Sequence, residues 1–143
     1  MKTGLVILLT ALLSSHIVWL NDIDKAKAEA SAKHRYILLN FSGSDWCVPC
    51  IRLKKNVFDT EEFISYADSS LVLLNADFPR TKKLEKQLLL HNEALAEKYN
   101  SEGKFPFTVL LNANGTVLKT WEEVADNPAT FISAINTIIH AGN

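Results

Sequence analysis

The chain has 143 residues, 48% of them hydrophobic, which suits one domain with an apolar core. Its formal net charge is −1, from 15 lysine and arginine residues against 16 aspartate and glutamate residues. The basic residues are scattered among acidic ones, with neither a basic stripe for nucleic acid nor an acidic tail, so we expect no nucleic-acid partner.

The N-terminal residues have the layout of a secretory signal peptide. Lys2 gives a positive start, and an apolar run follows that is shorter than the ~20 residues of a membrane-spanning helix. We predict a signal peptide at residues 1–15, cut after Ser15 although no A-x-A triplet marks the site. The mature domain, residues 16–143, would be exported, to the periplasm. The alternative is an uncleaved membrane anchor, because residues 17–20 extend the apolar stretch.

The first part of the mature chain predicts a helix and then a strand. Residues 21–34 are rich in Ala, Lys and Glu with apolar residues on one side, which is typical of an amphipathic helix capped by Asn21 or Asp22. Residues 36–41 form an apolar run that contains one Asn. Such a run indicates a strand covered on both faces of its sheet.

The middle of the chain continues the alternation of helices and strands. Helical apolar spacing occurs over residues 47–58 and again over 60–67, and a second buried strand is predicted at 71–76. A long helix is then expected over residues 81–100.

The C-terminal third predicts a hairpin and a final helix. Two strand-like runs, residues 107–111 and 116–121, flank an Asn-Gly turn, which is a strong hairpin signal. The last helix begins at Asn127 as its cap. Strands that alternate with helices pair in parallel, and the hairpin adds an antiparallel edge, so we expect a mixed sheet with helices on both faces. Trp19 and Trp121 are expected to be core or rim aromatics.

Both cysteines of the chain lie in one short segment, FSGSDWCVPC. Two intervening residues let the sulfurs of Cys47 and Cys50 meet across one helical turn, so that dithiol and disulfide interconvert with little backbone movement. At the start of a helix, unpaired N–H groups and the helix dipole favour the Cys47 thiolate. Pro49 suits this place because its missing N–H falls among donors without an intrahelical partner. We therefore predict that Cys47 attacks and that Cys50, shielded one turn further on, resolves.

A structural disulfide and a metal site are the alternatives for this cysteine pair. A disulfide that closes so short a loop adds little stability through loop entropy. Ile51 follows Cys50, which excludes the haem-attachment pattern C-x-x-C-H. We therefore expect a redox role with no cofactor and no metal. The four histidines have no metal-ligand spacing to the cysteines: His16, His34, His91 and His140.

Three features together resemble the thioredoxin superfamily, and most of all its secreted bacterial thioredoxin-like disulfide oxidoreductases. They are the WCVPC motif at residues 46–50 after a buried strand, the KFPFT segment at residues 104–108 before the hairpin, and the order of the elements. The resemblance covers roughly residues 36–140. It implies an α/β thioredoxin-like fold with a central mixed sheet of four to five strands and helices on both faces.

The resemblance also implies roles for individual residues. Cys47 would be the nucleophile and Cys50 the resolving cysteine. Pro106 matches the family's cis-proline, whose loop packs beside the disulfide and pairs with a bound substrate segment; an ordinary trans proline is the alternative. Active-site support or substrate binding is assigned to Trp46, Pro49, Phe105 and Pro106.

The chain departs from the family pattern at two positions. Asn40 stands where many thioredoxins carry a buried Asp that helps to move the proton of the resolving thiol, and Asn cannot exchange a proton at neutral pH. Asp45 is the candidate proton relay in its place, with a helix cap as the favoured alternative. Phe107 stands where the family usually has Thr, so we expect a more apolar substrate-facing loop. Three further acids are relay candidates that spacing does not rank: Glu61, Glu62 and Asp77.

These features predict an exported thiol-disulfide oxidoreductase. Val48-Pro49 resembles the Gly-Pro of thioredoxins more than the His-bearing insert of strong oxidants, which favours a reductase. Its partners would be an exported protein with a disulfide or dithiol and a membrane or periplasmic electron donor. The alternatives are a non-catalytic thioredoxin-like module that binds clients, and the handling of a thiophilic metal. Arg80 indicates an exposed charged turn, with a partner contact as the alternative; the oligomeric state stays open.

Overall fold

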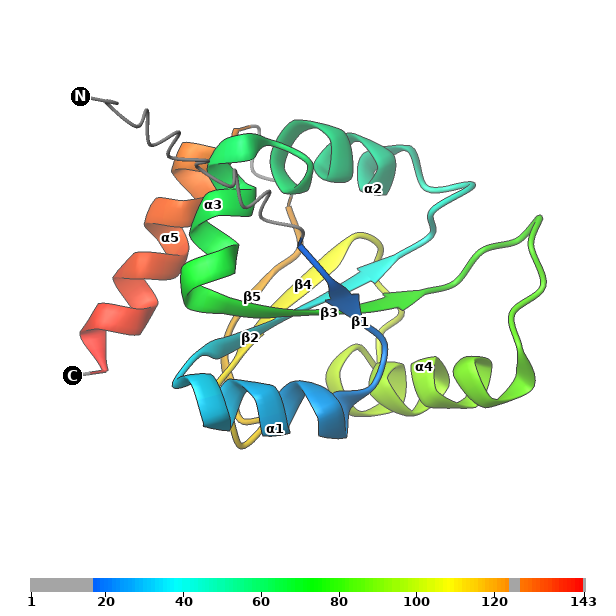
Figure 1. The fold of residues 1–143 in the computed structure, drawn as a ribbon. Coiled ribbons are helices and arrows are strands. Elements are labelled where there is room, and N and C mark those ends of the chain that lie inside the picture. The colour runs from blue at the N-terminus through cyan, green and yellow to red at the C-terminus, as the bar shows by residue number, and fades with distance from the viewer. Residues whose placement is uncertain (1–16, 124–126, 143) are drawn as a thin grey trace, which may run out of the picture.

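The computed structural model describes residues 17–123 and 127–142, which form a five-stranded sheet between two layers of helices (Figure 1). The strand order is β1-β3-β2-β4-β5. β3 pairs in parallel with β1 and β2, whereas β4 is antiparallel to both β2 and β5. The sheet is therefore mixed, as predicted. The strands are β1 (Trp19–Leu20), β2 (Tyr36–Ser42), β3 (Leu71–Asp77), β4 (Phe107–Leu111) and β5 (Val117–Trp121).

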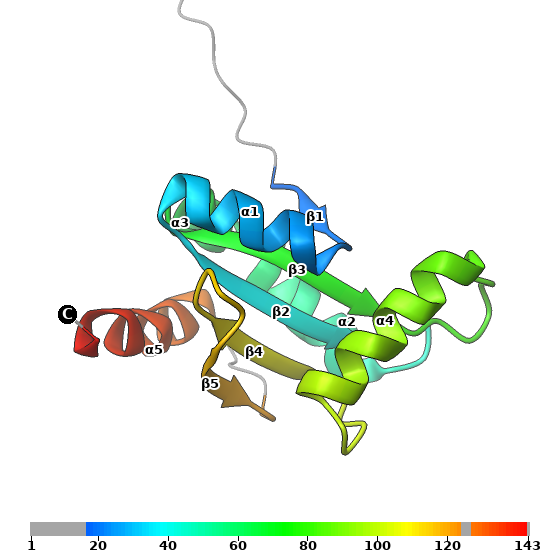
Figure 2. The same cartoon turned by 90° about the horizontal axis from the view of Figure 1, so that it is seen from below.

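Helices cover both faces of the sheet. Figure 2 shows α1 and α4 on one face, while α2, α3 and α5 lie on the other. Asp22 caps α1 by accepting the backbone N–H groups of Asp24 and Lys25, and Asn127 caps α5, as the sequence predicts. The helices are α1 (Ile23–Lys33), α2 (Val48–Leu53), the π-helix η1 (Lys54–Phe58), α3 (Glu61–Ser70), α4 (Lys86–Tyr99) and α5 (Pro128–Ala141).

Two apolar cores, one on each face, hold these layers together. Successive side chains of a strand point to opposite faces, so β2 contributes Ile37, Leu39 and Phe41 to the core under α1 and α4. Leu38 belongs to the second core, together with apolar residues of α2, η1, α3 and α5. By the same alternation Asn40 lies on the second face, which is the face that α2 covers.

Two helix predictions need correction, and one strand, β1, was not predicted. The sequence pattern does not predict β1, because a strand of two residues is too short to show periodicity. β1 forms by pairing with β3, with Trp19 opposite Leu73 and Leu20 opposite Leu74. The helix expected over 81–100 begins only at Lys86. The residues before it form a loop, in which the backbone N–H groups of Arg80 and Thr81 donate to Asp45. The helix expected over 47–58 changes to a π-helix at Lys54.

The predicted signal peptide at residues 1–15 lies outside the described residues. Residues 17–20, read above as a continuation of the N-terminal apolar run, include β1 and belong to the folded domain. Within the described part of the chain, no helix has the length and apolar character needed to cross a membrane.

Candidate active site

The two cysteines form a disulfide at the first turn of α2. Cys47 is the N-cap residue of this helix, and the backbone N–H of Cys50 donates to its Sγ at 3.3 Å. The two Cα atoms are 5.2 Å apart. Cys50 is 4% exposed, so it is shielded as predicted, and Cys47 is equally buried at 4%. Their difference is positional, because Cys47 ends the extended link and Cys50 lies inside the helix.

The indole of Trp46 covers the link that leads into this helix. Its Nε1 donates to the carbonyl oxygen of Phe78 at 2.7 Å, and its ring lies edge-on to Phe105 with centroids 5.5 Å apart. The guanidinium of Arg80 lies 3.8 Å from the ring centroid. A Cβ on Gly43 would approach the indole to 2.3 Å, so only glycine lets this ring pack here.

The Phe105–Pro106 peptide bond is cis, as the resemblance predicts. Pro106 is buried and directly precedes β4, and the contact between Phe105 and Trp46 places this loop beside the cysteine segment. The sequence suggested that Phe107 makes a substrate-facing loop more apolar, but the structure does not place it there. It is 8% exposed and packs against Phe41 in the core under α1 and α4.

A row of polar side chains crosses three neighbouring strands behind Cys50. Asn40 faces Asn75 on β3 and Thr108 on β4 in register. Its Nδ2 donates to Asn75 Oδ1 at 3.3 Å, and its Oδ1 accepts from Thr108 Oγ1 at 3.3 Å. A cavity of about 230 Å³ joins this row to the disulfide; its lining is Trp19, Asn40, Ser42, Ser44, Cys50, Lys54, Phe58 and Asn75.

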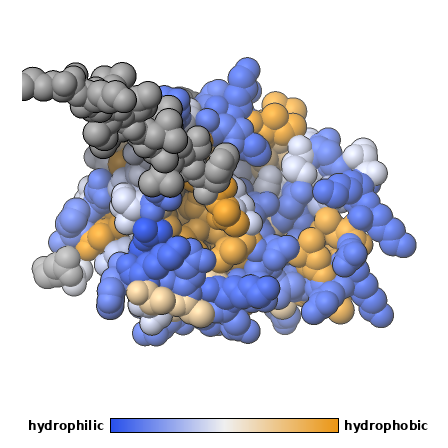
Figure 3. Space-filling view, in the orientation of Figure 1, coloured by the Kyte–Doolittle hydropathy of each residue, from blue (hydrophilic) through white to orange (hydrophobic). Residues whose placement is uncertain are grey.

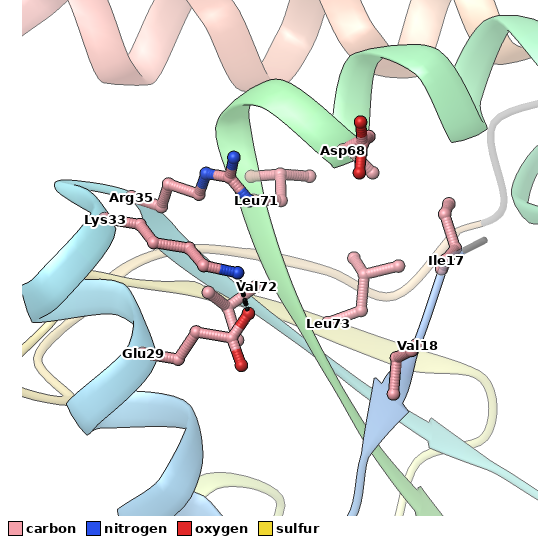
Figure 4. Close-up of a pocket in the computed structure, with 10 residues that line it drawn as sticks. Ile17, Val18, Glu29, Lys33, Arg35, Asp68, Leu71, Val72 and Leu73 are labelled. Atoms are coloured by element: carbon pink, nitrogen blue, oxygen red, sulfur yellow. Dashed lines mark hydrogen bonds and ion pairs between the residues drawn. The ribbon is translucent and has the colours of Figure 1, made fainter. Parts of the chain in front are cut away.

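Another hollow lies at the opposite end of β3 from this site, and Figure 4 shows the residues that line it. It has a volume of about 130 Å³ and borders the first residues of β3, Leu71 to Leu73, whereas the cysteine segment is tied to the last residue, Asp77. Its charged lining residues are Arg35, Asp68 and the ion pair of Glu29 with Lys33, whose side chains are 2.7 Å apart. None of the predicted site residues lines it.

A protein-family model described as thioredoxin-like matches residues 18–113 of the chain. The chain belongs to the thioredoxin-like family. The matched stretch contains β1 to β4, both cysteines and Pro106. Family and fold therefore agree with the sequence-based prediction.

Two sequence relatives in Chlamydia pneumoniae carry names from disulfide chemistry. Disulfide bond reductase DsbH is 27% identical over 115 residues, which are 80% of this chain and 69% of DsbH. Thioredoxin-related protein DsbJ is 28% identical over 99 residues, which are 69% of this chain and 28% of DsbJ, so the chain spans little more than a quarter of that protein.

Solved structures show the same fold. DsbH oxidoreductase superposes with a TM-score of 0.80 at 24% identity, over 96% of this chain and 95% of that one. A disulphide isomerase from Xylella fastidiosa Temecula1 superposes with a TM-score of 0.62 at 19% identity, over 90% of this chain and 98% of that one. With its cysteine pair, this thioredoxin-like chain is a thiol-disulfide oxidoreductase.

Asp45 does not cap the thioredoxin-like helix, because Cys47 occupies the N-cap position. Its carboxylate instead accepts hydrogen bonds from the hydroxyl of Thr81 and from the backbone N–H groups of Arg80 and Thr81. These bonds lower the pKa of Asp45 to about 2, and the bond from the Thr81 hydroxyl has the largest effect. So acidic a carboxyl binds a proton poorly at neutral pH, and this geometry does not favour the predicted relay.

The other acidic candidates are not among the residues that line the cavity behind Cys50. Glu61 and Glu62 are exposed in the first turn of α3. Asp77 accepts from the backbone N–H of Ser44 at 2.9 Å and from its hydroxyl at 2.5 Å, which ties the cysteine segment to the end of β3. Among the described residues that line the cavity, the charged one is Lys54, which is paired with Asp59 at 2.6 Å.

The histidines within the described residues lie away from the cysteine pair. His91 Nε2 accepts the backbone N–H of Ile23 at 3.1 Å, whereas His34 ends α1 and His140 lies in the last turn of α5. His16 is outside the described residues. In the part of the chain that is described, no three His, Cys, Asp or Glu side chains group as a metal ion would require.

Three residues of this site were not predicted from the sequence: Asn75, Thr108 and Gly43. A signal for Asn75 was present, because Leu-Leu-Asn occurs in both buried strands, at residues 38–40 and 73–75. Two parallel strands aligned on that repeat bring the two asparagines face to face. Thr108 and Gly43 carry no comparable pattern.

Proposed function

We propose that this chain is a reductase of disulfides in exported proteins, with Cys47 as the attacking and Cys50 as the resolving thiol. The observation that carries the proposal is the placement of the cysteine pair. Cys47 caps α2, and the Cys50 N–H points at its sulfur. After reduction this N–H stabilises a thiolate on Cys47, which is the attacking species in disulfide exchange. The reductase name of the DsbH relative supports the direction.

The proposed cycle starts from the dithiol form. The Cys47 thiolate attacks one sulfur of the client disulfide, forms a mixed disulfide and releases the first client thiolate. Cys50 then loses its proton and attacks Cys47, which forms the Cys47–Cys50 disulfide and releases the second client thiolate. Two electrons pass to the client. A dithiol electron donor at the membrane or in the periplasm then reduces the disulfide by the reverse exchange.

The residues around the disulfide suit contact with a client. Val48 and Ile51 are apolar yet 63% and 46% exposed on the helix that carries the cysteines. In this proposal the backbone beside Pro106 pairs with an extended client segment. The rings of Trp46 and Phe105, which contact each other, lie on one side of that segment. Pro49, at the start of α2, holds the helix entry without adding a donor that competes for the sulfur.

Single cysteine variants test the assignment of roles. Cys50→Ser stops the cycle at the mixed disulfide, so it is expected to accumulate a covalent complex with insulin that has its disulfides intact, or with another disulfide-bearing model client. Cys47→Ser should trap no complex and lose insulin reduction altogether. Nonreducing electrophoresis with mass spectrometry reads out both variants. Equal trapping by the two variants would contradict the roles, and unchanged client binding and phenotype in Cys47→Ser would favour a non-catalytic binding module.

The reduction potential tests the direction. Equilibration of the Cys47–Cys50 couple with glutathione buffers is expected to give a value near that of thioredoxin, about −270 mV. A value near that of a strong oxidant, about −120 mV, would reverse the proposed direction. Alkylation of free thiols followed by mass spectrometry measures the reduced fraction at each buffer ratio.

Export is the remaining part of the proposal. It is based on the positive start and short apolar run at residues 1–15. Expression of the full chain in a Gram-negative host should yield periplasmic protein that lacks these residues. Mass spectrometry of that protein checks the cut after Ser15, and an intact Met1 on it would contradict cleavage and favour the membrane anchor.

A further inference from the structure

The loop between β3 and α4 concentrates positive charge. Arg80, Lys82, Lys83 and Lys86 follow one another closely, and Glu85 is the one acidic residue among them. All four basic residues are exposed, and none takes part in the ion pairs of the described chain. The chain as a whole has a net charge of −1, so this is a local excess rather than a general property. We name residues 79–86 the basic loop.

Hydrogen bonds fasten the basic loop to the segment that carries the cysteines. Asp45, two residues before Cys47, accepts the backbone N–H groups of Arg80 at 2.9 Å and Thr81 at 2.8 Å. The Arg80 guanidinium covers the Trp46 ring at 3.8 Å. In Figure 1 the β2–α2 link and the β3–α4 loop lie at the same end of the molecule. The loop is thus held in place before a client arrives, which reduces the entropy lost on binding.

A cavity with an apolar floor lies beside the basic loop. This cavity has a volume of about 450 Å³, and three of the lysines border it; its lining is Phe78, Pro79, Lys82, Lys83, Leu84, Lys86 and Leu89. Figure 3 shows this end of the molecule with a hydrophobic patch among hydrophilic residues. Leu89 and Leu90, on the first turns of α4, are also exposed. An apolar floor with a lysine rim fits a segment that has both apolar and acidic side chains.

We propose that the basic loop is a docking surface for an acidic segment of the client, next to the client disulfide. Carboxylates of the client meet the lysines, and one of its apolar side chains enters the cavity between them. The proposal rests on the reductase function above and specifies its class of client. Opposite charge raises the rate of encounter more than it strengthens the final complex, so the effect is largest at low salt.

The test compares two disulfide-linked peptides that differ only in four residues flanking the cysteine, Glu in one and Gln in the other. The reduced full chain is expected to reduce the Glu peptide about tenfold faster than the Gln peptide at low ionic strength, and the ratio should fall as salt is added. The triple variant Lys82→Gln, Lys83→Gln, Lys86→Gln should lose this preference and keep the rate on the Gln peptide.

A matched triple variant controls for net charge. Lys25→Gln, Lys98→Gln and Lys119→Gln remove three exposed lysines from α1, α4 and β5 and should retain the preference. The charge-reversed variant Lys82→Glu, Lys83→Glu, Lys86→Glu should prefer a peptide with Lys in the four flanking positions. Equal rates on the Glu and Gln peptides for the unmodified chain, or a preference that survives removal of the three loop lysines, would overturn the proposal.

A binding measurement separates this proposal from the proposed function. Cysteine-free versions of the two peptides, with Ser in place of Cys, are titrated against the oxidised protein by fluorescence anisotropy. Tighter binding of the Glu version, lost in the loop variant, supports docking. If neither disulfide peptide is reduced while this binding preference persists, the reductase function is rejected and the docking surface is not. Binding to phosphatidylglycerol vesicles through the loop lysines, with no preference between the peptides, would assign the surface to lipid and overturn the proposal.

Discussion

On its inner side the disulfide faces a row of neutral side chains on the sheet, whereas on its outer side it adjoins a charged loop at the surface. The inner row consists of Asn40, Asn75 and Thr108, which satisfy one another across three strands. The outer loop is held by the ionised Asp45 and carries Arg80 against Trp46. The two sides therefore differ in chemistry: the inner row is polar and neutral, whereas the outer loop carries exposed positive charge.

The cost of desolvation accounts for this division. An amide or hydroxyl tolerates burial when it is hydrogen-bonded, whereas an ionised group is far more costly to remove from water. Asn40 is 7% exposed, and the amide is compatible with that position. The lysines of the basic loop stay in water, where their charge costs little. Among the described residues that line the cavity beside Cys50, none is an aspartate or a glutamate.

The largest effect is expected from placing a charge in the inner row. Asn40→Asp puts a carboxyl in a nearly buried position, where desolvation raises its pKa above that of the unfolded chain. Stability that depends on the protonated form is present at acid pH and is lost as pH rises through the folded-state pKa. We expect a loss of about 2–4 kcal/mol at pH 8 and much less at pH 4. Urea unfolding of the oxidised protein at several pH values measures it.

An exposed asparagine provides the control for this prediction. Asn114→Asp lies in the hairpin turn and should change stability by no more than ~0.5 kcal/mol at any of these pH values. An Asn40→Asp protein as stable as the unmodified one at pH 8 would remove the distinction between a neutral inner side and a charged outer side.

An intermediate effect is expected where the cysteine link meets Trp46. Gly43→Ala adds a Cβ that would approach the indole to 2.3 Å, so the ring must shift and lose its bond to the Phe78 carbonyl. Overpacking of this kind costs about 1–3 kcal/mol. Urea unfolding should show that loss, and displacement of Trp46 should also weaken the hold on the basic loop.

Gly142→Ala is the matched substitution, because a Cβ there meets nothing within 4 Å. It should leave the midpoint of unfolding unchanged. If the two alanine variants unfold alike, then Trp46 is free to move, and the outer side is less rigid than described.

The smallest effect is expected from the anchor of the basic loop. The pKa of Asp45 is about 2 in the folded protein, below its ordinary value of 3.8. A lowered folded-state pKa contributes stability above the unfolded value, and this contribution is lost as pH falls towards the folded value. Asp45→Asn should therefore lower the melting temperature slightly near neutral pH, and the difference should shrink below about pH 3. The effect is small because the carboxylate is exposed.

Thermal unfolding from pH 2 to pH 7 checks the prediction for Asp45. Glu97→Gln, an exposed substitution on α4 without a hydrogen-bond partner among the described residues, serves as the control and should show no comparable trend. A constant difference between Asp45→Asn and the unmodified protein over this range would mean that the carboxylate charge does not hold the loop.

Local patterns predicted most of the elements. The apolar run at residues 107–111 coincides with β4, and Asp22 caps α1, because apolar spacing and capping depend on neighbours in sequence. Capping was wrong for Asp45, and the family comparison was wrong for Phe107, which faces the core. In both cases the deciding partner is distant in sequence: Phe41 for Phe107, and the backbone of residues 80 and 81 for Asp45.

The redox pair could be identified from the sequence because its two cysteines, the proline between them and the helix they begin are contiguous. Their geometry follows from one turn of helix. The residues that surround the pair could not be identified from the sequence. The polar row joins side chains that are 35 and 68 positions apart in the sequence, and Asp45 binds the basic loop across 35 positions. Strand register and loop docking decide which side chains meet over such distances, and both depend on packing of the whole sheet. The chain thus encodes its chemistry locally, while what surrounds that chemistry is set by the fold.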